Sequence, residues 1–500
     1  MKQFMVFITL VWMISCTTHV EEEGIIGTWK YTAVDAPFGF QSGKVIFYEE
    51  NDSIKAKLKI YGFTLPANNL IIEENKISFS AWVETEEVAI NLEMQNGKML
   101  GSVKASDLSS PISMVKKGHI NSSDSEKIFQ DKLISRAQIE AVLKQRKNVL
   151  ADGVNKEKEL NYRVHTFYYG WFGNPDNNGA YKAWSGGVVP HTVDTTWNNA
   201  KPYPGGEDIT SNFYPQLGCY SSIDTDVIDI HMQQIKQAGI GVVVLSWWGN
   251  GGYTDKSVND ILNIAHKYGL KIAFHIEPFY KTVDVFKTNL KYISETYNQH
   301  PAIYMFEGKP MYYLYNSFQL NHDDWFSMLN PESETTIRNT KLDGVFISLW
   351  TTRFDGEFTV KADFDGFYTY FASDGFSHGS TTENWPGMAA FAQENNLVYC
   401  PSVGPGYIDT RIRPWNEKNT KAREEGKYYE TMFEKAVNTK PDFIGITSFN
   451  EWHEGTQIES SVPKELPNYT YEDFGKDVDP LFYINKTKEL IDKYILIKTD

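Results

Sequence analysis

The stretch DVIDIHMQQIKQAGIGVVVLSWWG (residues 226–249) decides the fold, because a helix-like pattern in it runs directly into a strand-like one. In residues 226–239 apolar side chains recur with the period of an amphipathic helix, and a glycine ends the pattern. Residues 240–247 form an apolar run of the length of a buried strand. A helix followed by such a strand is the repeating unit of an α/β fold with a parallel sheet.

The same alternation of helix-like and strand-like patterns recurs along the last two-thirds of the chain. Eight strand-like runs, most of them separated by a helical pattern, follow one another: RVHTFYYGWF, IGVVVLSWWG, LKIAFHIEPF, PMYYLYNS, LDGVFISLW, GFYTYFAS, LVYCPSVGPGY and DFIGITSFNEW. Eight β/α units in roughly 340 residues predict a (β/α)8 TIM barrel with enlarged loops. A doubly wound open sheet is the main rival. It needs a glycine-rich phosphate turn, and GNGG (residues 249–252) lacks the last glycine of that fingerprint.

A small all-β module is predicted ahead of the barrel. Over residues 24–118 short alternating runs are divided by turn signals, of which Asn96-Gly97 is a strong hairpin signal. We expect a sandwich or a lipocalin-like half-barrel without catalytic residues. Residues 119–158 have helical spacing and many charges, which predict a helical linker, and the (β/α)8 catalytic domain is expected over residues 160–498.

The first residues are typical of a targeting segment. Lys2 precedes an apolar run that is too short to span a bilayer and ends at Cys16, as in a bacterial lipoprotein signal peptide of residues 1–16. We expect Cys16 to be lipidated and the acidic residues 21–23 to direct export, which predicts an outer-membrane or cell-surface lipoprotein, with a periplasm-facing one as the alternative. An ordinary cleaved signal is the simpler interpretation. The remaining cysteines are predicted to be buried thiols: Cys219 and Cys400.

Charge and composition narrow the class of ligand. The net charge of −16 disfavours binding to nucleic acid or to anionic lipid, so the membrane is expected to be reached only through the lipid anchor. The chain has 13 Trp, 29 Tyr and 30 Phe residues, which either fill a large core or stack on sugar rings. A neutral glycan fits this balance better than a polyanion.

The strand ends carry the residues that could do chemistry, since a TIM barrel places its active site where strands end. Most of the eight runs end in an aromatic ring or a carboxylate: Tyr168, Tyr169, Trp171, Trp247, Trp248, Glu277, Tyr312, Tyr313, Tyr315, Trp350, Tyr368, Tyr370, Tyr407, Glu451 and Glu454. Any single ring is most simply a core residue. Together they predict an aromatic-walled, acidic cleft of the kind that carbohydrate enzymes use.

The stretch SFNEWHEGTQIE (residues 448–459) is the most acidic of these ends. His453-Glu454 does not begin an HExxH zinc motif, because position 457 is glutamine, and no serine-hydrolase elbow follows a strand. Paired carboxylates remain, as glycosidic cleavage requires. Glu451 and Glu454 would lie up to about 10 Å apart in an extended chain. On a helical turn their Cβ atoms would be about 5–6 Å apart. The first spacing suits inversion and the second retention.

Several long motifs, in order, resemble those of glycoside hydrolase family 99, the endo-α-mannosidases and endo-α-mannanases: YYGWFGNPDNNGAYKAW, VVLSWWGNGG, HIEP, FDGFYTYFASDGF, PSVGPGYIDTRIRPWN and SFNEWHEGTQIE. The resemblance runs from about Tyr162 to the C-terminus and does not cover the β module. It implies a retaining (β/α)8 hydrolase that needs no metal or other cofactor. Its two catalytic carboxylates fall on Glu451 and Glu454.

The resemblance also implies a mechanism. Glu451 draws the proton from O2 of the mannose, O2 attacks C1 to give a 1,2-anhydro sugar, and Glu454 protonates the leaving oxygen. Water then opens the epoxide with the roles reversed. We expect a raised pKa for Glu454, so that it begins protonated near neutral pH.

Substrate-binding positions follow from the same motifs. Tyr168 or Tyr169, Glu277 and Tyr370 are expected to line the subsites, with Trp247, Trp248, Trp452 and His453 beside them. By family resemblance, the position of Trp248, the second tryptophan of SWWG, carries Trp in mannan-degrading bacterial members and Tyr in the animal enzymes. Arg411 and Arg413 could bind sugar hydroxyls or form structural ion pairs, and Glu459 has no assigned role.

These observations predict an endo-acting retaining hydrolase that cleaves internal α-1,2-mannosidic bonds of mannan. The alternatives are release of glucosyl-mannose from glucosylated high-mannose N-glycans and a catalytically silent mannan-binding lipoprotein. The expected partners are an α-mannan or high-mannose glycan and neighbouring glycan-uptake proteins.

Overall fold

The computed structural model describes residues 22–33, 42–50, 53–60, 63–83, 86–95, 97–105, 108–116, 136–190, 201–278, 280–473 and 479–496. The chain divides into two compact units, Met1–Lys127 and Ile128–Asp500. The expected signal peptide and Cys16 lie outside the described residues. None of the helices in the described ranges is long and apolar enough to cross a membrane.

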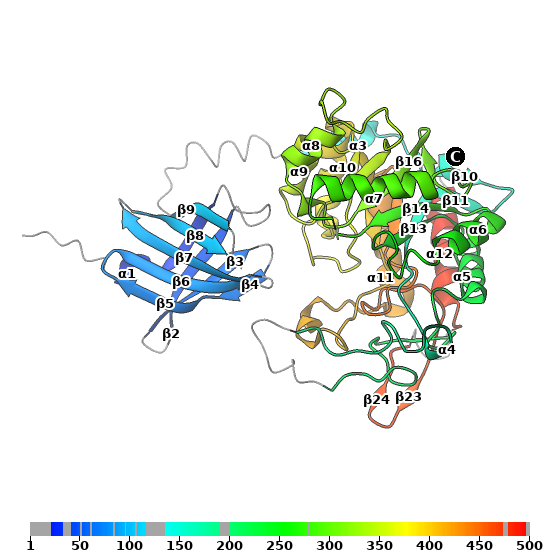
Figure 1. The fold of residues 1–500 in the computed structure, drawn as a ribbon, viewed down its shortest axis with the longest axis horizontal. Helices are drawn as coiled ribbons and strands as arrows, with labels where there is room; N and C mark the ends of the chain where they lie inside the picture. Colours follow the sequence, from blue (N-terminus) through cyan, green and yellow to red (C-terminus); the bar gives the residue numbers. More distant parts are fainter. Residues whose placement is uncertain are drawn as a thin grey trace, which may run out of the picture. The chain divides into compact units, whose positions relative to one another are not determined.

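The first unit is one curved antiparallel sheet of nine strands (Figure 1). After the short helix α1 (Glu22–Ile25) come β1 (Gly27–Thr32), β2 (Ser42–Glu50), β3 (Ser53–Ile60), β4 (Phe63–Pro66), β5 (Asn68–Glu73), β6 (Lys76–Val83), β7 (Glu86–Gln95), β8 (Lys98–Ala105) and β9 (Leu108–Lys116). The strand order is β4-β3-β2-β1-β9-β8-β7-β6-β5, a single sheet rather than two facing ones. Its two end strands, β4 and β5, are consecutive in the chain and separated by Ala67. The Ala67 N–H donates to the carbonyl of Ala56 on β3 at 2.9 Å.

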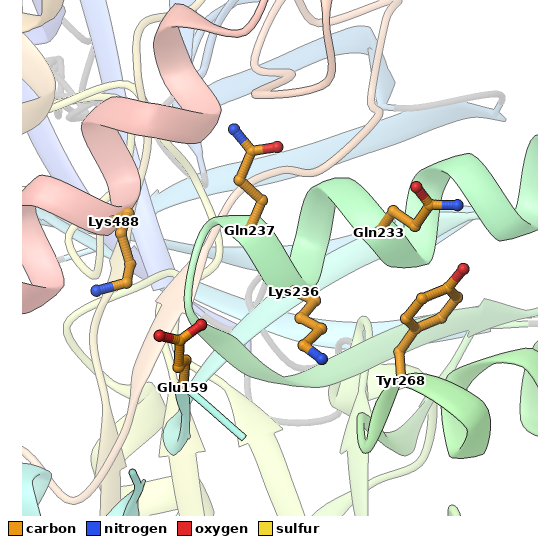
Figure 2. Close-up of a pocket in the computed structure, with 6 residues that line it drawn as sticks. All are labelled: Glu159, Gln233, Lys236, Gln237, Tyr268 and Lys488. Atoms are coloured by element: carbon orange, nitrogen blue, oxygen red, sulfur yellow. The ribbon is translucent and has the colours of Figure 1, made fainter. Parts of the chain in front are cut away.

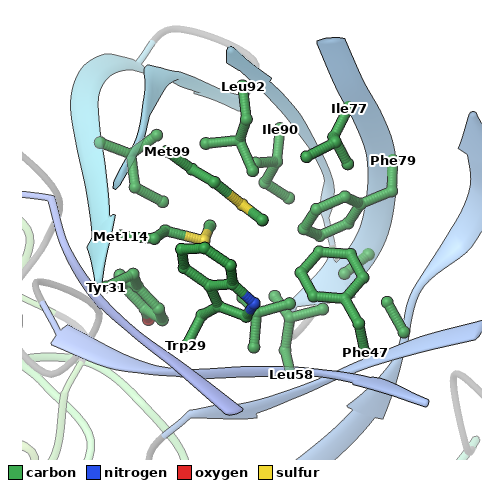
Figure 3. Close-up of a cluster of buried hydrophobic side chains, with 14 of the residues drawn as sticks. Trp29, Tyr31, Phe47, Leu58, Ile77, Phe79, Ile90, Leu92, Met99 and Met114 are labelled. Atoms are coloured by element: carbon green, nitrogen blue, oxygen red, sulfur yellow. The ribbon is translucent and has the colours of Figure 1, made fainter. Parts of the chain in front are cut away.

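Large apolar side chains fill the inside of this sheet (Figure 3). Trp29, Phe47, Phe79, Met99 and Met114 are each at most 3% exposed, and the rings of Phe47 and Phe79 meet edge to face with centroids 6.2 Å apart. Burying one such side chain contributes about 1.5–3 kcal/mol, so this interior is a stabilising core.

The second unit is built on a parallel sheet that returns on itself. Its strands are β11 (Leu160–Tyr169), β13 (Ile240–Trp247), β14 (Lys271–Ile276), β16 (Lys309–Leu314), β17 (Val345–Leu349), β18 (Gly366–Tyr368), β19 (Val398–Cys400), β20 (Ser402–Val403) and β21 (Ile444–Ile446). The order is β19-β18-β17-β16-β14-β13-β11-β21-β20, and only Pro401 separates the two end strands, β19 and β20. The eight predicted runs therefore all form strands, and the sheet is a nearly closed parallel barrel.

Helices follow the strands along the chain and cover the outside of the barrel (Figure 1). They are α5 (Thr225–Gln237), α6 (Val258–Tyr268), α7 (Val283–Thr296), α8 (His322–Leu329), α9 (Asp355–Lys361), α10 (Trp385–Glu394), α11 (Lys427–Asn438) and α12 (Phe482–Ile491). Local signals fix several of them. The side chains of Asp224 and Thr282 cap the first turns of α5 and α7, and Gly269 ends α6 in the left-handed conformation.

Shorter elements lie in the connections. They are α4 (Pro175–Asn178), β10 (Val154–Asn155), β12 (Tyr214–Pro215), β15 (Met305–Phe306), β22 (Ser461–Val462), β23 (Glu465–Leu466), β24 (Tyr469–Thr470), η1 (Leu150–Gly153), η3 (Ser317–Gln319), η4 (Thr382–Asn384), η5 (Pro414–Asn419), η6 (Glu424–Gly426) and η7 (Asp492–Leu496). The longest connections follow β11, β20 and β21, at the carboxyl ends of the strands.

The described end of the predicted linker is attached to the barrel unit. Helix α3 (Arg136–Gln145) packs on α10. The next residue, Arg146, donates to the carbonyl of Ala389 at 3.1 Å and pairs with Asp442 at 3.1 Å. This part of residues 119–158 therefore belongs to the second unit rather than to a free spacer.

Candidate active site

The acidic stretch forms a compact loop, residues 447–459, directly after β21. The N–H of Ser448 donates to the carbonyl of Thr456 at 2.9 Å, which folds the loop back on itself. Gly455 has a φ of +59°, and a Cβ atom there would lie 2.6 Å from the carbonyl oxygen of Ile408. Only glycine fits this close approach, so the loop conformation and the directions of its acids are well determined.

Glu451 is 4% exposed and is held from both sides. Its N–H donates to Oγ of Ser448 at 2.7 Å, and its Oε1 accepts the N–H of His453 at 3.1 Å. The imidazole Nδ1 of His453 lies 3.4 Å from the same oxygen, while Nε2 lies 2.6 Å from the carbonyl of Ala183. Both ring nitrogens thus face acceptors. Burial lowers the pKa of His453, but the contacts with Glu451 and with the Ala183 carbonyl together outweigh it, and the net pKa is raised.

Glu454 lies beside a guanidinium group. Nη1 of Arg413 is 3.4 Å from Oε1 of Glu454 and 3.1 Å from Oδ2 of Asp409. Burial raises the pKa of Glu454 to about 7, and the charges of Glu451 and Asp409 act in the same direction, against the lowering effect of Arg413. At neutral pH this carboxyl group is therefore available both as a proton donor and as a proton acceptor.

Glu277, at the end of β14, is a third buried carboxyl group. It accepts a hydrogen bond from Oγ of Ser246 at 2.6 Å. Burial raises its pKa to about 8, with a further contribution from the charge of Glu451. Nδ1 of His275 lies 3.4 Å from Oε1 of Glu277, but burial lowers the pKa of His275 to about 3. The imidazole is therefore neutral, and the contact is not an ion pair.

Two tyrosines meet next to these acids. The hydroxyl groups of Tyr169 and Tyr370 share a short hydrogen bond. Asn450 fixes the first of them, since its side chain accepts from the Tyr169 N–H at 2.7 Å and donates to the Tyr169 carbonyl at 2.9 Å. Burial raises the pKa of both phenols well above the usual value, and the charges of Glu451 and Glu454 add to this, so both stay neutral.

An aromatic surface borders the same cluster. Trp248 is 44% exposed, and its indole N–H donates to Oγ of Ser246 at 3.2 Å, the hydroxyl that also binds Glu277. The ring of Trp171 lies between those of Trp248 and His453, with centroids 6.4 and 6.2 Å away. These contacts join the ends of β11, β13 and β14 to the acidic loop.

Three predicted substrate-binding residues are not part of this cluster. Tyr168, Trp247 and Trp452 are fully buried. Each uses its polar atom elsewhere: Tyr168 OH lies 3.0 Å from Nδ1 of His231, Trp247 Nε1 donates to Asp255 at 2.7 Å, and Trp452 Nε1 donates to Glu459 at 2.8 Å. Successive side chains of a strand point to opposite faces, so Tyr169 points to the cluster and Tyr168 away from it.

The two arginines of IDTRIRPW have different surroundings. Arg411 pairs with Asp208 and lies 4.1 and 3.9 Å from the rings of Tyr203 and Tyr469. It is a structural residue, whereas Arg413 reaches the acid. The cysteines also differ: Cys400 is buried as predicted, and Cys219 is only partly buried.

Some residues of the cluster gave little signal in the sequence. Ser246 and His275 lie inside apolar runs, and Asp409 lies in a connection whose contacts depend on the fold. Glu459, which has no role assigned from the sequence, is fully buried and contacts Trp452, Tyr220 and His231.

Two further features of the described residues concern possible ligand sites. In these ranges no group of three or more His, Cys, Asp or Glu side chains is arranged to hold a metal ion. Figure 2 shows a surface pocket at the start of β11 and the ends of α5 and α6, lined by Glu159, Gln233, Lys236, Gln237, Tyr268 and Lys488. These positions lie where strands begin, the face of a parallel barrel opposite the acids.

The chain is similar to several known proteins. The glycoprotein endo-alpha-1,2-mannosidase of Rattus norvegicus is 44% identical over 365 residues, which cover 69% of this chain and 78% of that protein. The glycoprotein endo-alpha-1,2-mannosidase-like protein of Homo sapiens is 44% identical over 351 residues, or 66% of this chain and 76% of that one. A solved structure of the GH99 endo-alpha-mannosidase from Bacteroides thetaiotaomicron matches with a TM-score of 0.64 and 41% identity, covering 67% of this chain and 98% of that chain.

The family comparison covers the whole barrel. Residues 159–496 match Glycosyl hydrolase family 99, and the matched range includes the acids, the tyrosine pair and Trp248. The chain therefore belongs to glycosyl hydrolase family 99, the family of endo-α-mannosidases, and is a glycoside hydrolase.

Proposed function

We propose that the protein is an endo-acting retaining hydrolase that cleaves internal α-1,2-mannosidic bonds of mannan, working at the mouth of a (β/α)8 TIM barrel. The observation that carries this is the pair on one loop. Glu451 is oriented by His453, and three residues later Glu454 has a pKa of about 7. A fixed acceptor beside a partly protonated donor is the arrangement that glycosidic bond cleavage requires.

In the first step the substrate supplies its own nucleophile. Glu451 removes the proton from O2, O2 forms a bond to C1, and the bond from C1 to the leaving oxygen breaks as Glu454 protonates that oxygen. In an α-mannoside O2 is axial and anti to the leaving group, which permits this displacement. The product of the step is a 1,2-anhydro sugar.

In the second step water restores the enzyme. Glu454, now ionised, takes a proton from water, the water oxygen bonds to C1, and the epoxide oxygen returns to O2 with the proton held by Glu451. Two inversions at C1 give net retention. A pKa near 7 suits a group that must donate in one step and accept in the next.

The surrounding side chains have assigned roles in this proposal. Glu277, Tyr169 and Tyr370 bind hydroxyl groups of the cleaved mannose and its neighbours, and Trp248 stacks on a sugar ring beyond it. Trp248 is the residue that supports mannan as the substrate, since the family resemblance associates Trp at this position with mannan-degrading bacterial members. His453 contributes by orienting Glu451.

We also propose that the protein is a surface lipoprotein anchored through Cys16, next to glycan-uptake proteins. The supporting observation is the apolar run that ends at this cysteine. Growth with a labelled fatty acid should label the wild type and leave Cys16→Ser unlabelled. Labelling of both would refute the anchor.

The function is tested by sizing products. Incubation with yeast α-mannan should release a disaccharide and leave shortened chains. A glucosylated high-mannose N-glycan should be cut far more slowly. Faster release of glucosyl-mannose from the N-glycan would overturn the mannan assignment, and binding without new reducing ends would overturn the proposed catalysis.

A further inference from the structure

The connection after β20 brings a second charged group to the acids. Asp409 is fully buried there, and its Oδ2 accepts from the hydroxyl of Tyr407 at 2.9 Å, from Asn416 at 3.0 Å and from Arg413 at 3.1 Å. Its other oxygen, Oδ1, has no hydrogen-bond partner among the described residues. A buried carboxylate that binds an arginine so closely restricts where the guanidinium can lie.

The same connection is joined to the acidic loop. The N–H of Ile408 donates to the main-chain carbonyl of Glu454 at 2.9 Å, and Nη1 of Arg413 reaches Oε1 of Glu454 at 3.4 Å. Glu454 is therefore held at its backbone by one residue of the connection and faced at its carboxyl group by another.

The conformation of the connection after β20 is fixed without the contact between Arg413 and Glu454. Tyr407 and Asn416 already hold Asp409, and the main chain of Arg413 donates to the Asp409 carbonyl at 2.7 Å. The side chain of Arg413 nevertheless remains 34% exposed and extends to the carboxyl group of Glu454. An arginine that served only packing would be enclosed, as Arg411 is.

Resting on the function proposed above, we infer that Asp409 and Arg413 form a positioning pair that holds Glu454 and sets the pH range in which it can donate its proton. Neither residue needs to touch the reacting atoms. Arg413 acts on Glu454 through its charge. Asp409 acts through its own charge and by sharing the Arg413 guanidinium with Glu454, two effects of the same sign.

Arg413 and Asp409 shift the pKa of Glu454 in opposite directions because their charges are opposite. The ionisable groups facing this carboxyl group are Arg413, Glu451, Asp409, Tyr169, Tyr370 and Tyr407. Arg413 supplies the cation and lowers the pKa of Glu454, whereas Asp409 raises it. Removing the cation should therefore extend activity to higher pH, and removing the buried anion should restrict it to lower pH.

The test compares pH profiles of kcat/KM for Arg413→Gln and Asp409→Asn. The alkaline limb, which reports loss of the Glu454 proton, should move upward in the first variant and downward in the second, each by about 1–3 pH units. Arg413→Lys keeps the charge and should stay near the wild type. Lys287→Gln removes one charge from α7 and should leave the limb in place.

A direct titration covers variants with little activity. Carbon-13 NMR of Glu-labelled protein, with the Glu454 signal identified by its loss in Glu454→Gln, should show the same opposite movements. Shifts in the same direction, or none, would overturn the inference. A wild type that releases nothing from mannan but shows the opposite shifts would overturn the proposed function and leave the pair intact.

Discussion

The two sheets of this protein close in the same way and differ in what they enclose. Each comes back on itself through one interrupted strand, at Ala67 in the antiparallel sheet and at Pro401 in the parallel one. The first encloses Trp, Phe and Met side chains. The second encloses a run of polar contacts, such as His165 with Tyr313 at 2.8 Å and His275 with Tyr368 at 2.7 Å.

The two interiors differ in how burial of their side chains changes the free energy of folding. A buried apolar ring stabilises by leaving water, whereas a buried imidazole or carboxyl group costs free energy unless it is hydrogen-bonded. The parallel barrel contains such buried polar groups, and carboxyl groups with raised pKa values follow the carboxyl ends of its strands. Strongly perturbed pKa values of this kind concentrate at functional sites.

The largest contrast should come from the same isosteric change, Glu to Gln, made in each of the two units. Glu454→Gln removes the proposed proton donor and should lower kcat/KM on mannan by about 10²–10⁴-fold while mannan binding is retained. Glu87→Gln, which alters the acceptor of the Ser80 hydroxyl in the antiparallel sheet, should leave the rate unchanged. Initial rates and affinity electrophoresis on mannan measure both. An unchanged rate in Glu454→Gln would remove it from the mechanism.

The opposite result, a loss of stability without a loss of rate, is expected when a side chain of the apolar core in the first unit is truncated. Phe79→Ala leaves a cavity beside Phe47 and Met99 and should cost about 3–5 kcal/mol of unfolding free energy in the first unit. Urea unfolding followed by far-UV circular dichroism and tryptophan fluorescence, in which Trp29 and Trp82 belong to the first unit, measures the shift of this unit's transition. The rate of mannan hydrolysis under the proposed function should stay at the wild-type level below that transition. A matching fall in rate would mean that the two units depend on each other for activity.

The strands were predictable because their signal is local. An apolar run such as residues 240–247 needs no knowledge of its neighbours to be recognised. The position of Glu451 and Glu454 at a strand end was predictable for the same reason, since both follow such a run on one short loop. The direction in which adjacent side chains point at a strand end was not predictable from the sequence. Tyr168 and Trp247 were expected in the cluster and are buried behind it, one residue out of phase with Tyr169 and Trp248.

Contacts between connections were beyond the sequence as well. The pairing of Arg413 with Glu454 joins residues 41 positions apart on different connections, and nothing local distinguishes Arg413 from Arg411. Glu459 gave no local signal of burial, because glutamate side chains are mostly exposed unless they are paired. Only the fold brings Tyr220 and His231 to it.

A smaller effect, on the pH dependence of stability, should also distinguish the two interiors. Burial raises the pKa of Glu277 from 4.5 to about 8, so the folded protein holds this proton more tightly than the unfolded chain. The stability it contributes is complete below pH 4.5 and is lost as the pH rises through about 8.

Glu277→Gln removes that loss, because a glutamine does not titrate. The variant should therefore gain stability relative to the wild type as the pH rises from 4.5 to 8.5. Urea midpoints of the barrel transition at several pH values measure the difference. A difference that does not change with pH would show that Glu277 ionises normally. The transition of the antiparallel unit is the internal control and should be the same in both proteins.

The smallest effect is expected at the rim, where the polar interior meets solvent. Trp248 is 44% exposed, so Trp248→Tyr loses ring area and the indole N–H to Ser246 but disturbs no core. KM for mannan should rise roughly 2–10-fold with little change in kcat, since a binding contact away from the reacting bond affects both states alike. Phe326→Tyr on α8, equally exposed at 44%, is the matched control and should change neither constant. If kcat falls instead, Trp248 acts on the bond that breaks, and the polar interior reaches further outward than its buried carboxyl groups.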